Sequence, residues 1–111
     1  MIKRVYRLKS PRVFRQAYQK GKSVVNPYLV LYYRKNMRKQ YRIGISVSKK
    51  VGKAVARNRI KRKLREICRL NENVFPAGYD LIFVARAKTK DASYQKLEKN
   101  LLSLVQKIGT V

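Results

Sequence analysis

The first 65 residues of this chain contain no acidic side chain. They hold 22 of its 29 lysines and arginines, and the five acidic residues all come later: Glu66, Glu72, Asp80, Asp91 and Glu98. The net charge is +24 over 111 residues, so self-repulsion has to be offset by a polyanionic partner, of which nucleic acid is the first candidate. Within one compact domain this asymmetry predicts one strongly positive side and one nearly neutral side.

Composition indicates a folded binding module rather than a basic tail. Hydrophobic residues make up 45% of the chain, and its length suffices for one core, so we expect a single nucleic-acid-binding domain over residues 1–111. The chain has no histidine and one cysteine, Cys68, which excludes Ser/His triads, Cys/His dyads and metal clusters built from thiolates or imidazoles. A self-sufficient enzyme is therefore not expected.

The same composition bears on location. One cysteine cannot form an intrachain disulfide, residues 1–7 lack the apolar run of a signal peptide, and no segment has the roughly 18 apolar residues that span a bilayer. We therefore expect a cytoplasmic protein with no membrane partner.

A helix is predicted near the amino terminus. Ser10 is a candidate N-cap, Pro11 suits the first helical position, and Gly21 is a helix stop, so the helix should cover residues 11–20. Its apolar stripe consists of Val13, Phe14, Ala17 and Tyr18.

Two strands should follow. Residues 28–33 and 41–48 are typical of strands, residues 34–39 form a polar turn between them, and a short strand near Val24 could precede them. We expect the two strands to pair as a hairpin. The second strand alternates between an apolar face with Tyr41, Ile43, Ile45 and Val47 and a small polar face with Arg42, Gly44, Ser46 and Ser48.

The rest of the chain predicts a helix, a strand and a helix. Residues 53–70 lack Gly and Pro, and the uninterrupted apolar run within 79–85 is typical of a strand covered on both faces. A last helix, capped by Asp91 or Ser93, should stop at Gly109. The expected fold is thus an α/β (α+β) sandwich, with helices packed on a small mixed sheet. Apolar stripes predict the buried residues Ala56, Ile60, Leu64 and Ile67 in the first of these helices and Tyr94, Leu97, Leu101, Leu104, Val105 and Ile108 in the second.

Cationic side chains form a continuous flank along the helix at 53–70. At 100° per residue, Arg59, Lys63 and Glu66 fall on the other side of the helix. Like charges at this spacing repel by a few tenths of a kcal/mol per pair, which favours phosphate contact over a merely solvated face. Asn58 could brace the arginines, bind sugar or base edges, or cap the helix. The flank consists of Arg57, Asn58, Lys61, Arg62, Arg65 and Arg69.

Aromatic side chains could line a groove beside the small polar face. Phe14 and Tyr18 share one helix face, and Tyr28, Val30 and Tyr32 share one side of the next strand. Single-stranded RNA binds such surfaces by stacking bases on rings. Burial in the core is an equal alternative for Phe14 and Tyr18, and the core is the expected place of Tyr33 and Tyr41.

Residues 44–52, which read GISVSKKVG, lead into residues 54–66, which contain Arg57-Asn58-Arg59. This run resembles the signature of the bacterial ribonuclease P protein family. Residues that also fit are Arg7-Leu8-Lys9, Phe14, Tyr18, Val30-Leu31-Tyr32 and Ala85-Arg86, so the resemblance covers nearly the whole chain.

This resemblance implies a fold and a role. The fold would be similar to domain 2 of ribosomal protein S5, with a left-handed βαβ crossover around the basic helix, contrary to the usual handedness. The protein would be an accessory subunit of a ribonucleoprotein endoribonuclease. It would bind the catalytic RNA and the 5′ leader of precursor tRNA, assisting the magnesium-dependent removal of the leader that gives the mature tRNA 5′ end.

Two sets of site residues follow from the resemblance and the patterns above. The catalytic RNA would contact Arg57, Asn58, Arg59, Lys61, Arg62 and Arg65, with Arg69 added from the same flank. The leader would lie in a cleft lined by Phe14, Tyr18 and Tyr32, beside Arg42, Ser46, Ser48, Lys49 and Lys50.

No catalytic or metal-binding residue is predicted on the protein. Hydrolysis with two metal ions needs clustered carboxylates, and five scattered acids supply no close pair in sequence, so Mg²⁺ would be held mainly by the RNA. No protein partner is predicted. The rival hypotheses are a ribosomal protein or double-stranded-RNA domain, a protein-only nuclease and a DNA-packaging protein.

Overall fold

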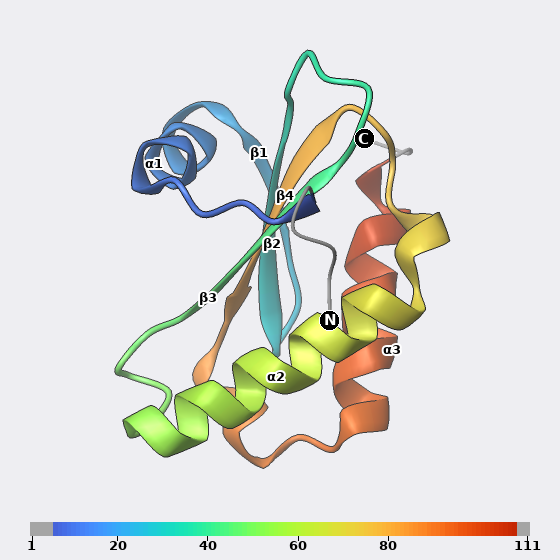
Figure 1. Cartoon of the computed structure of the whole chain (residues 1–111). Helices are drawn as coiled ribbons and strands as arrows, with labels where there is room; N and C mark the ends of the chain where they lie inside the picture. Colours follow the sequence, from blue (N-terminus) through green and yellow to red (C-terminus); the bar gives the residue numbers. More distant parts are fainter. Residues whose placement is uncertain (1–5, 109–111) are drawn as a thin grey trace.

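The computed structural model describes residues 6–108, which form three α-helices and a four-stranded sheet (Figure 1). No helix in this range combines the length and apolar character that crossing a lipid bilayer requires. The elements are α1 (Pro11–Lys20), β1 (Lys22–Val25), β2 (Leu29–Lys35), β3 (Arg42–Val47), α2 (Ala54–Leu70), the 3₁₀ turn η2 (Glu72–Val74), β4 (Tyr79–Ala85), the 3₁₀ turn η3 (Ala87–Asp91) and α3 (Tyr94–Gln106).

The strand order is β1-β2-β4-β3, which contradicts the predicted hairpin of β2 and β3. β4 lies between those strands, antiparallel to β2 and parallel to β3. Burial favours this order: Leu81, Ile82 and Phe83 are each 0% exposed, as in a strand that is paired on both edges and lies between two packed layers. The hairpin of this sheet is instead β1 with β2, so the short strand near Val24 is confirmed.

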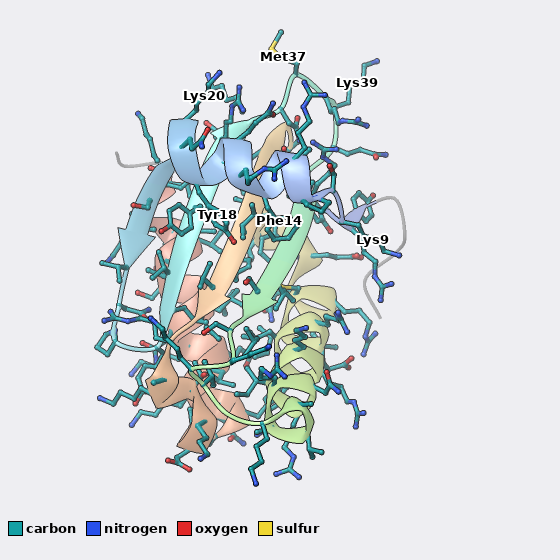
Figure 2. The ribbon with its side chains drawn as sticks, turned by 90° about the vertical axis from the view of Figure 1, so that its left-hand side faces the viewer. Lys9, Phe14, Tyr18, Lys20, Met37 and Lys39 are labelled. Carbon is teal, nitrogen blue, oxygen red and sulfur yellow. The ribbon has the colours of Figure 1, made fainter. Side chains whose placement is uncertain are left out.

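The connection from β3 through α2 to β4 is left-handed. Seen from the α1 side, β4 lies to the left of β3, both strands run downward, and α2 crosses behind the sheet (Figure 2). This agrees with the handedness that the resemblance implies and departs from the usual right-handed crossover.

The sheet separates two layers of unequal size. α2 and α3 cover one face, and α1 crosses the other (Figure 1). The larger core lies between the sheet and α2 and α3, and it contains Leu31, Phe83, Leu64, Leu97 and Leu101, all 0% exposed. The smaller cluster lies under α1 and is built on Leu8, Ala17 and Ile82.

Buried residues of α2 confirm most of the predicted stripe. Ile60, Leu64 and Ile67 are buried as expected, but Ala56 is only half-buried and Cys68 is buried as well. Ala56 lies in the first turn of α2, where it lines a pocket together with Val55 and Lys90 instead of packing fully into the core.

The helix boundaries follow the predicted signals with local differences. α1 begins at Pro11, but the side chain of Ser10 makes no capping bond. Gly21 has φ −81°, so it is not a left-handed stop; a Cβ there would lie 2.5 Å from the carbonyl oxygen of Ala17. Ser93 caps α3 by accepting a bond from the Lys96 amide. The predicted stop at Gly109 lies outside the described residues.

In α3, Leu97, Leu101, Leu104 and Val105 are buried as predicted, and so is Ile108 beyond its end. Tyr94 is only half-buried. The stripe of this helix therefore closes the larger core, as its spacing predicts.

Cys68 should be chemically inert in the folded protein. It is 1% exposed, and burial raises the pKa of its thiol to about 12, so the thiolate that reacts is scarce near neutral pH and increases only as pH approaches that value. We expect reaction with Ellman's reagent at pH 8 to be at least roughly a hundredfold slower than in guanidinium-unfolded protein. Equal rates in the two states would contradict this burial.

Candidate nucleic-acid interface

The cationic flank of α2 is largely open to solvent. Asn58, Arg62 and Arg65 are exposed, and together with Glu66 they line a pocket of about 400 Å³. Arg57 is partly buried, and its Nε is buried without a hydrogen-bond partner among the described residues. A guanidinium in this state can still bind a phosphate through its remaining donors. The helix therefore presents a row of donors with little internal pairing.

Glu66 does not lie apart from this flank, so that prediction is wrong. It lines the same pocket as Arg65 and forms an ion pair with Arg69, whose Nε donates to Glu66 Oε2 at 3.2 Å. Long side chains three residues apart on a helix reach each other, although their Cβ atoms point in different directions. The hydrogen bond from Arg69 lowers the pKa of the Glu66 carboxyl. Arg69 is thus partly neutralised within the protein.

The segment before α1 adds charge to the same side. The Leu8 amide donates to the Ile43 carbonyl oxygen at 2.8 Å, so this segment runs along the edge of β3. Arg7 and Lys9 then line a small pocket of about 80 Å³ together with Arg65. Basic residues 56 and 58 positions apart in sequence are thereby brought together beside α2.

A ring cluster occupies the other face of the sheet. Phe14 and Tyr18 project from α1 onto it, and the rings of Tyr18 and Tyr32 lie 4.8 Å apart between centroids (Figure 2). Phe14 packs directly over Gly44, where a Cβ would come within 2.5 Å of the Phe14 Cζ. The small residue in β3 therefore lets α1 approach the sheet. Because α1 covers only the upper part of this face, the strands below it remain uncovered (Figure 2).

The aromatic side chains singled out in the sequence differ in how deeply they are buried. Tyr18 is 40% exposed, whereas Phe14 and Tyr32 are half-buried in the smaller cluster. Burial raises the pKa of the Tyr18 hydroxyl, and a hydrogen bond with Ser46 acts in the opposite direction. Tyr33 is buried in the core as predicted.

Tyr41 packs half-buried against the larger core, also as predicted, and stacks on Tyr6 with 4.5 Å between ring centroids. This places Tyr41 on the α2 side of the sheet, away from the ring cluster under α1.

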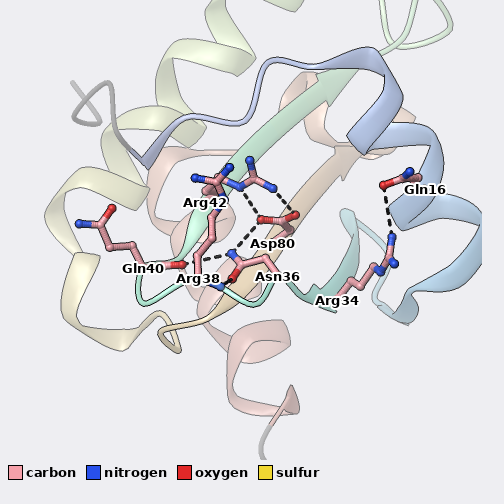
Figure 3. Close-up of polar contacts among 7 residues, drawn as sticks. All are labelled: Gln16, Arg34, Asn36, Arg38, Gln40, Arg42 and Asp80. Atoms are coloured by element: carbon pink, nitrogen blue, oxygen red, sulfur yellow. Dashed lines mark hydrogen bonds and ion pairs between the residues drawn. The ribbon is translucent and has the colours of Figure 1, made fainter.

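Arg42 has a structural partner that sequence reasoning missed. Its Nε and one terminal nitrogen each donate to the carboxylate of Asp80 at 2.8 Å, and Asn36 donates to the same carboxylate at 3.0 Å (Figure 3). The Asp80 side chain is 6% exposed and that of Arg42 is 19% exposed. The two residues are register partners in neighbouring parallel strands. Arg42 lies on the predicted face, but two of its donors serve this ion pair.

A basic turn follows the end of β3. Ser48, Lys49 and Lys50 are exposed, and the turn is closed by a bond from the Val51 amide to the Ser48 carbonyl oxygen. Val51 is 4% exposed and anchors the turn to the core. α2 begins at Ala54, so the turn joins β3 to the cationic helix without an intervening element.

A third group of cations lies beside this turn and was not predicted. Because β3 and β4 are parallel, their carboxyl ends meet at one edge, and η3 after β4 brings Lys90 to Gly52. Lys90 and Arg59 line a pocket of about 350 Å³ at the start of α2. Lys88 lies 5.1 Å from the ring centre of Tyr28, and Arg86 donates to the Asn26 carbonyl oxygen. Only knowledge of the strand pairing could have revealed this group.

Carboxylates do not gather into a metal site in the described part of the chain, where no three His, Cys, Asp or Glu residues are placed to hold an ion. Asp80 is bound by Arg42, Glu66 by Arg69, and Glu98 by the side-chain amide of Asn71 at 3.0 Å. Because each of these carboxylates already has a partner and they lie apart, they do not fit a magnesium cage.

Comparison with known proteins agrees with the fold. The family model described as ribonuclease P matches residues 2–109. The chain belongs to the ribonuclease P protein family. It is therefore a protein subunit of ribonuclease P, a tRNA-processing enzyme in which it acts with an RNA partner. This membership sets aside the ribosomal, double-stranded-RNA and DNA-packaging hypotheses.

Several ribonuclease P proteins are similar over nearly their full length. The protein component from Clostridioides difficile strain 630 is 48% identical over 102 residues, covering 90% of this chain and 89% of the relative. The component from Clostridium kluyveri is 46% identical, covering 95% and 96%.

Solved structures of ribonuclease P proteins match as well. The Thermotoga maritima protein has a TM-score of 0.85 at 37% identity, covering 91% of this chain and 96% of that one. A Staphylococcus aureus mutant described as defective in mRNA degradation activity has a TM-score of 0.88 at 36% identity, covering 95% and 89%.

Proposed function

We propose that this ribonuclease P protein binds the catalytic RNA through α2 and holds the 5′ leader of precursor tRNA in the groove beside α1. Bond breaking belongs to the RNA. The observation that carries the proposal is the direct chain connection between the two regions, because β3 runs beneath the ring cluster, ends in the turn with Lys49 and Lys50, and leads into α2. One RNA-bound helix thus positions a single-strand groove next to it.

The groove suits a single strand better than a duplex. The ring of Tyr18 is exposed, and the ring of Tyr32 lies against it. In β3, the small residues Gly44 and Ser46 add little side-chain bulk on the α1 side of the sheet. A base can stack on such a ring only when it is not paired within a helix. Exposed Lys49 and Lys50 then supply phosphate contacts beyond the groove.

α2 supplies the larger electrostatic contribution. Each lysine or arginine that neutralises a phosphate releases counterions, so affinity for RNA should fall steeply with salt. The RNA-binding set proposed is the predicted one, Arg57, Asn58, Arg59, Lys61, Arg62 and Arg65, with a smaller part for Arg69 because it already pairs with Glu66.

Magnesium, in this proposal, is held mainly by RNA. The pairing of Asp80, Glu66 and Glu98 within the protein supports it, since these carboxylates already have partners. The protein is proposed to need no cofactor and no protein partner, and its cytoplasmic location stays a prediction.

The deciding experiment compares multiple-turnover cleavage of precursor tRNA by RNA alone, by RNA with this protein, and by the protein alone with Mg²⁺. At low magnesium we expect the protein to raise turnover by the RNA and to show no cleavage by itself. Equal cleavage with and without the protein would refute the accessory role. Cleavage by the protein alone would establish the rival protein-only nuclease.

Arg65→Ala should weaken assembly of the holoenzyme and flatten its salt dependence by about one phosphate contact. Arg65 is exposed, lines two pockets with other α2 or amino-terminal residues, and has no acidic partner at hydrogen-bond distance in the described structure. The measurement is the dissociation constant for the catalytic RNA over a series of KCl concentrations. Lys99→Ala, on the exposed face of α3, is the control and should keep the wild-type slope. An unchanged slope in Arg65→Ala would remove this residue from the interface.

A further inference from the structure

A separate pocket of about 250 Å³ lies at the opposite end of the sheet from Lys49 and Lys50. It forms where β2 ends and β4 begins, beside the start of β1 and the end of α3 (Figure 1). None of its residues takes part in the proposed function. They are Lys20, Gly21, Lys22, Tyr33, Arg34, Lys35, Tyr79 and Ile108.

Two tyrosines give the pocket an aromatic side. Tyr33 is 5% exposed, Tyr79 is half-buried, and their ring centroids lie 6.3 Å apart. The Tyr33 hydroxyl oxygen is buried and has no hydrogen-bond partner among the described residues. Such a hydroxyl has lost its bonds to water without replacing them, so a polar ligand atom that reached it would restore a bond.

Lysines accompany both tyrosines on the same face of the sheet. Lys22 is the register partner of Tyr33, and Lys35 is the register partner of Tyr79. Directly opposed residues of paired strands point to the same side, so each lysine adjoins one ring at the pocket. Lys20 joins them from the end of α1, and all three lysines are exposed. Among residues 6–108 no acidic side chain lines the pocket, so the lysines there have no counter-charge from this part of the chain.

We propose that this pocket binds a nucleotide. The base would lie against Tyr33 and Tyr79, with its polar edge bonded to the Tyr33 hydroxyl, and the phosphate would lie among Lys20, Lys22 and Lys35. The volume is below the range of about 300–1,000 Å³ typical of drug-sized ligands, which suits a single base with its phosphate at the open rim. The nucleotide could be free or the terminal nucleotide of an RNA chain, since both offer the same chemistry.

The test is titration of the ¹⁵N-labelled full chain, followed by NMR, with AMP, with inorganic phosphate and with a 5′-phosphorylated RNA tetranucleotide. We expect AMP to shift the amides of Gly21, Lys22, Arg34 and Lys35, with at least tenfold higher affinity than phosphate. The same shifts with the tetranucleotide would identify a terminal RNA nucleotide as a ligand, and their absence would restrict the pocket to free nucleotides. Equal affinity for phosphate would mean an adventitious ion only, and shifts confined to α2 would also overturn the proposal.

Two variants distinguish binding of AMP in the pocket from general electrostatic attraction of AMP to a cationic protein. Tyr33→Phe keeps the ring, removes the hydroxyl, and should weaken AMP binding by about fivefold to tenfold without unfolding the chain. Lys22→Gln/Lys35→Gln should weaken it by at least about tenfold. The matched control Lys96→Gln/Lys99→Gln removes equal charge from exposed positions on α3 and should leave affinity within about twofold. Equal loss in both double variants would refute the pocket as the site.

Discussion

Asp80→Ala is expected to lower the free energy of unfolding by about 3–5 kcal/mol, because it removes one partner of a largely buried ion pair. The carboxylate of Asp80 accepts hydrogen bonds from Arg42 and from Asn36. Without it the Arg42 guanidinium, whose side chain is 19% exposed, keeps its charge in a site that water reaches poorly. Urea unfolding followed by circular dichroism measures the loss.

Asp91→Ala is the matched control for Asp80→Ala. It makes the same change in net charge, but Asp91 is exposed at the end of η3, so the expected effect on unfolding is within about 0.5 kcal/mol. If Asp80→Ala lowers the free energy of unfolding no more than this control does, the ion pair contributes to stability only through net charge. The ion pair is expected to affect the stability of the fold, because it connects the neighbouring strands β3 and β4.

Phe14→Ala should reduce the preference of the holoenzyme for leader-bearing tRNA over mature tRNA by about tenfold, as expected for the loss of one ring from a stacking surface. Phe14 packs between Gly44 and Tyr18, with its ring centroid 6.3 Å from that of Tyr18. Binding of the catalytic RNA should change little. The measurement is the ratio of dissociation constants for the two tRNA forms.

Gly44→Ala tests the same surface without removing the ring. The added Cβ would lie 2.5 Å from the Phe14 Cζ, so the ring and α1 have to shift outward. We expect a similar loss of leader preference, and unfolding experiments on both variants show whether the domain remains folded. Equal losses of leader preference and of affinity for the catalytic RNA would assign Phe14 a purely structural role.

Local signals predicted most elements of this fold. Pro11 and Gly21 mark the ends of α1, and the apolar spacing of Ile60, Leu64 and Ile67 identifies the buried side of α2. These signals are reliable because they depend on bonds and contacts within a few residues. The cationic flank and the ring pair Phe14 and Tyr18 are visible for the same reason, since helical periodicity alone places them on common faces.

Strand pairing was not predictable in the same way. β2 and β3 look like a hairpin because they are neighbours in sequence, but β4 is the strand that has to be buried on both faces, and it therefore separates them. The partners of Arg42 and Lys90 follow from that placement, because Asp80 and Gly52 reach them only when β3 and β4 are parallel neighbours.

The amino-acid sequence by itself determined the partition of charge, the helix faces and the family resemblance, because each depends on residue type and short spacing. Only the tertiary structure decided that β4 separates β2 from β3, and that Tyr33 is buried at the far end of the sheet with a hydroxyl that has no partner among the described residues. The physical reason is that contacts between strands far apart in sequence are chosen by competition for burial across the whole chain, which no local pattern records.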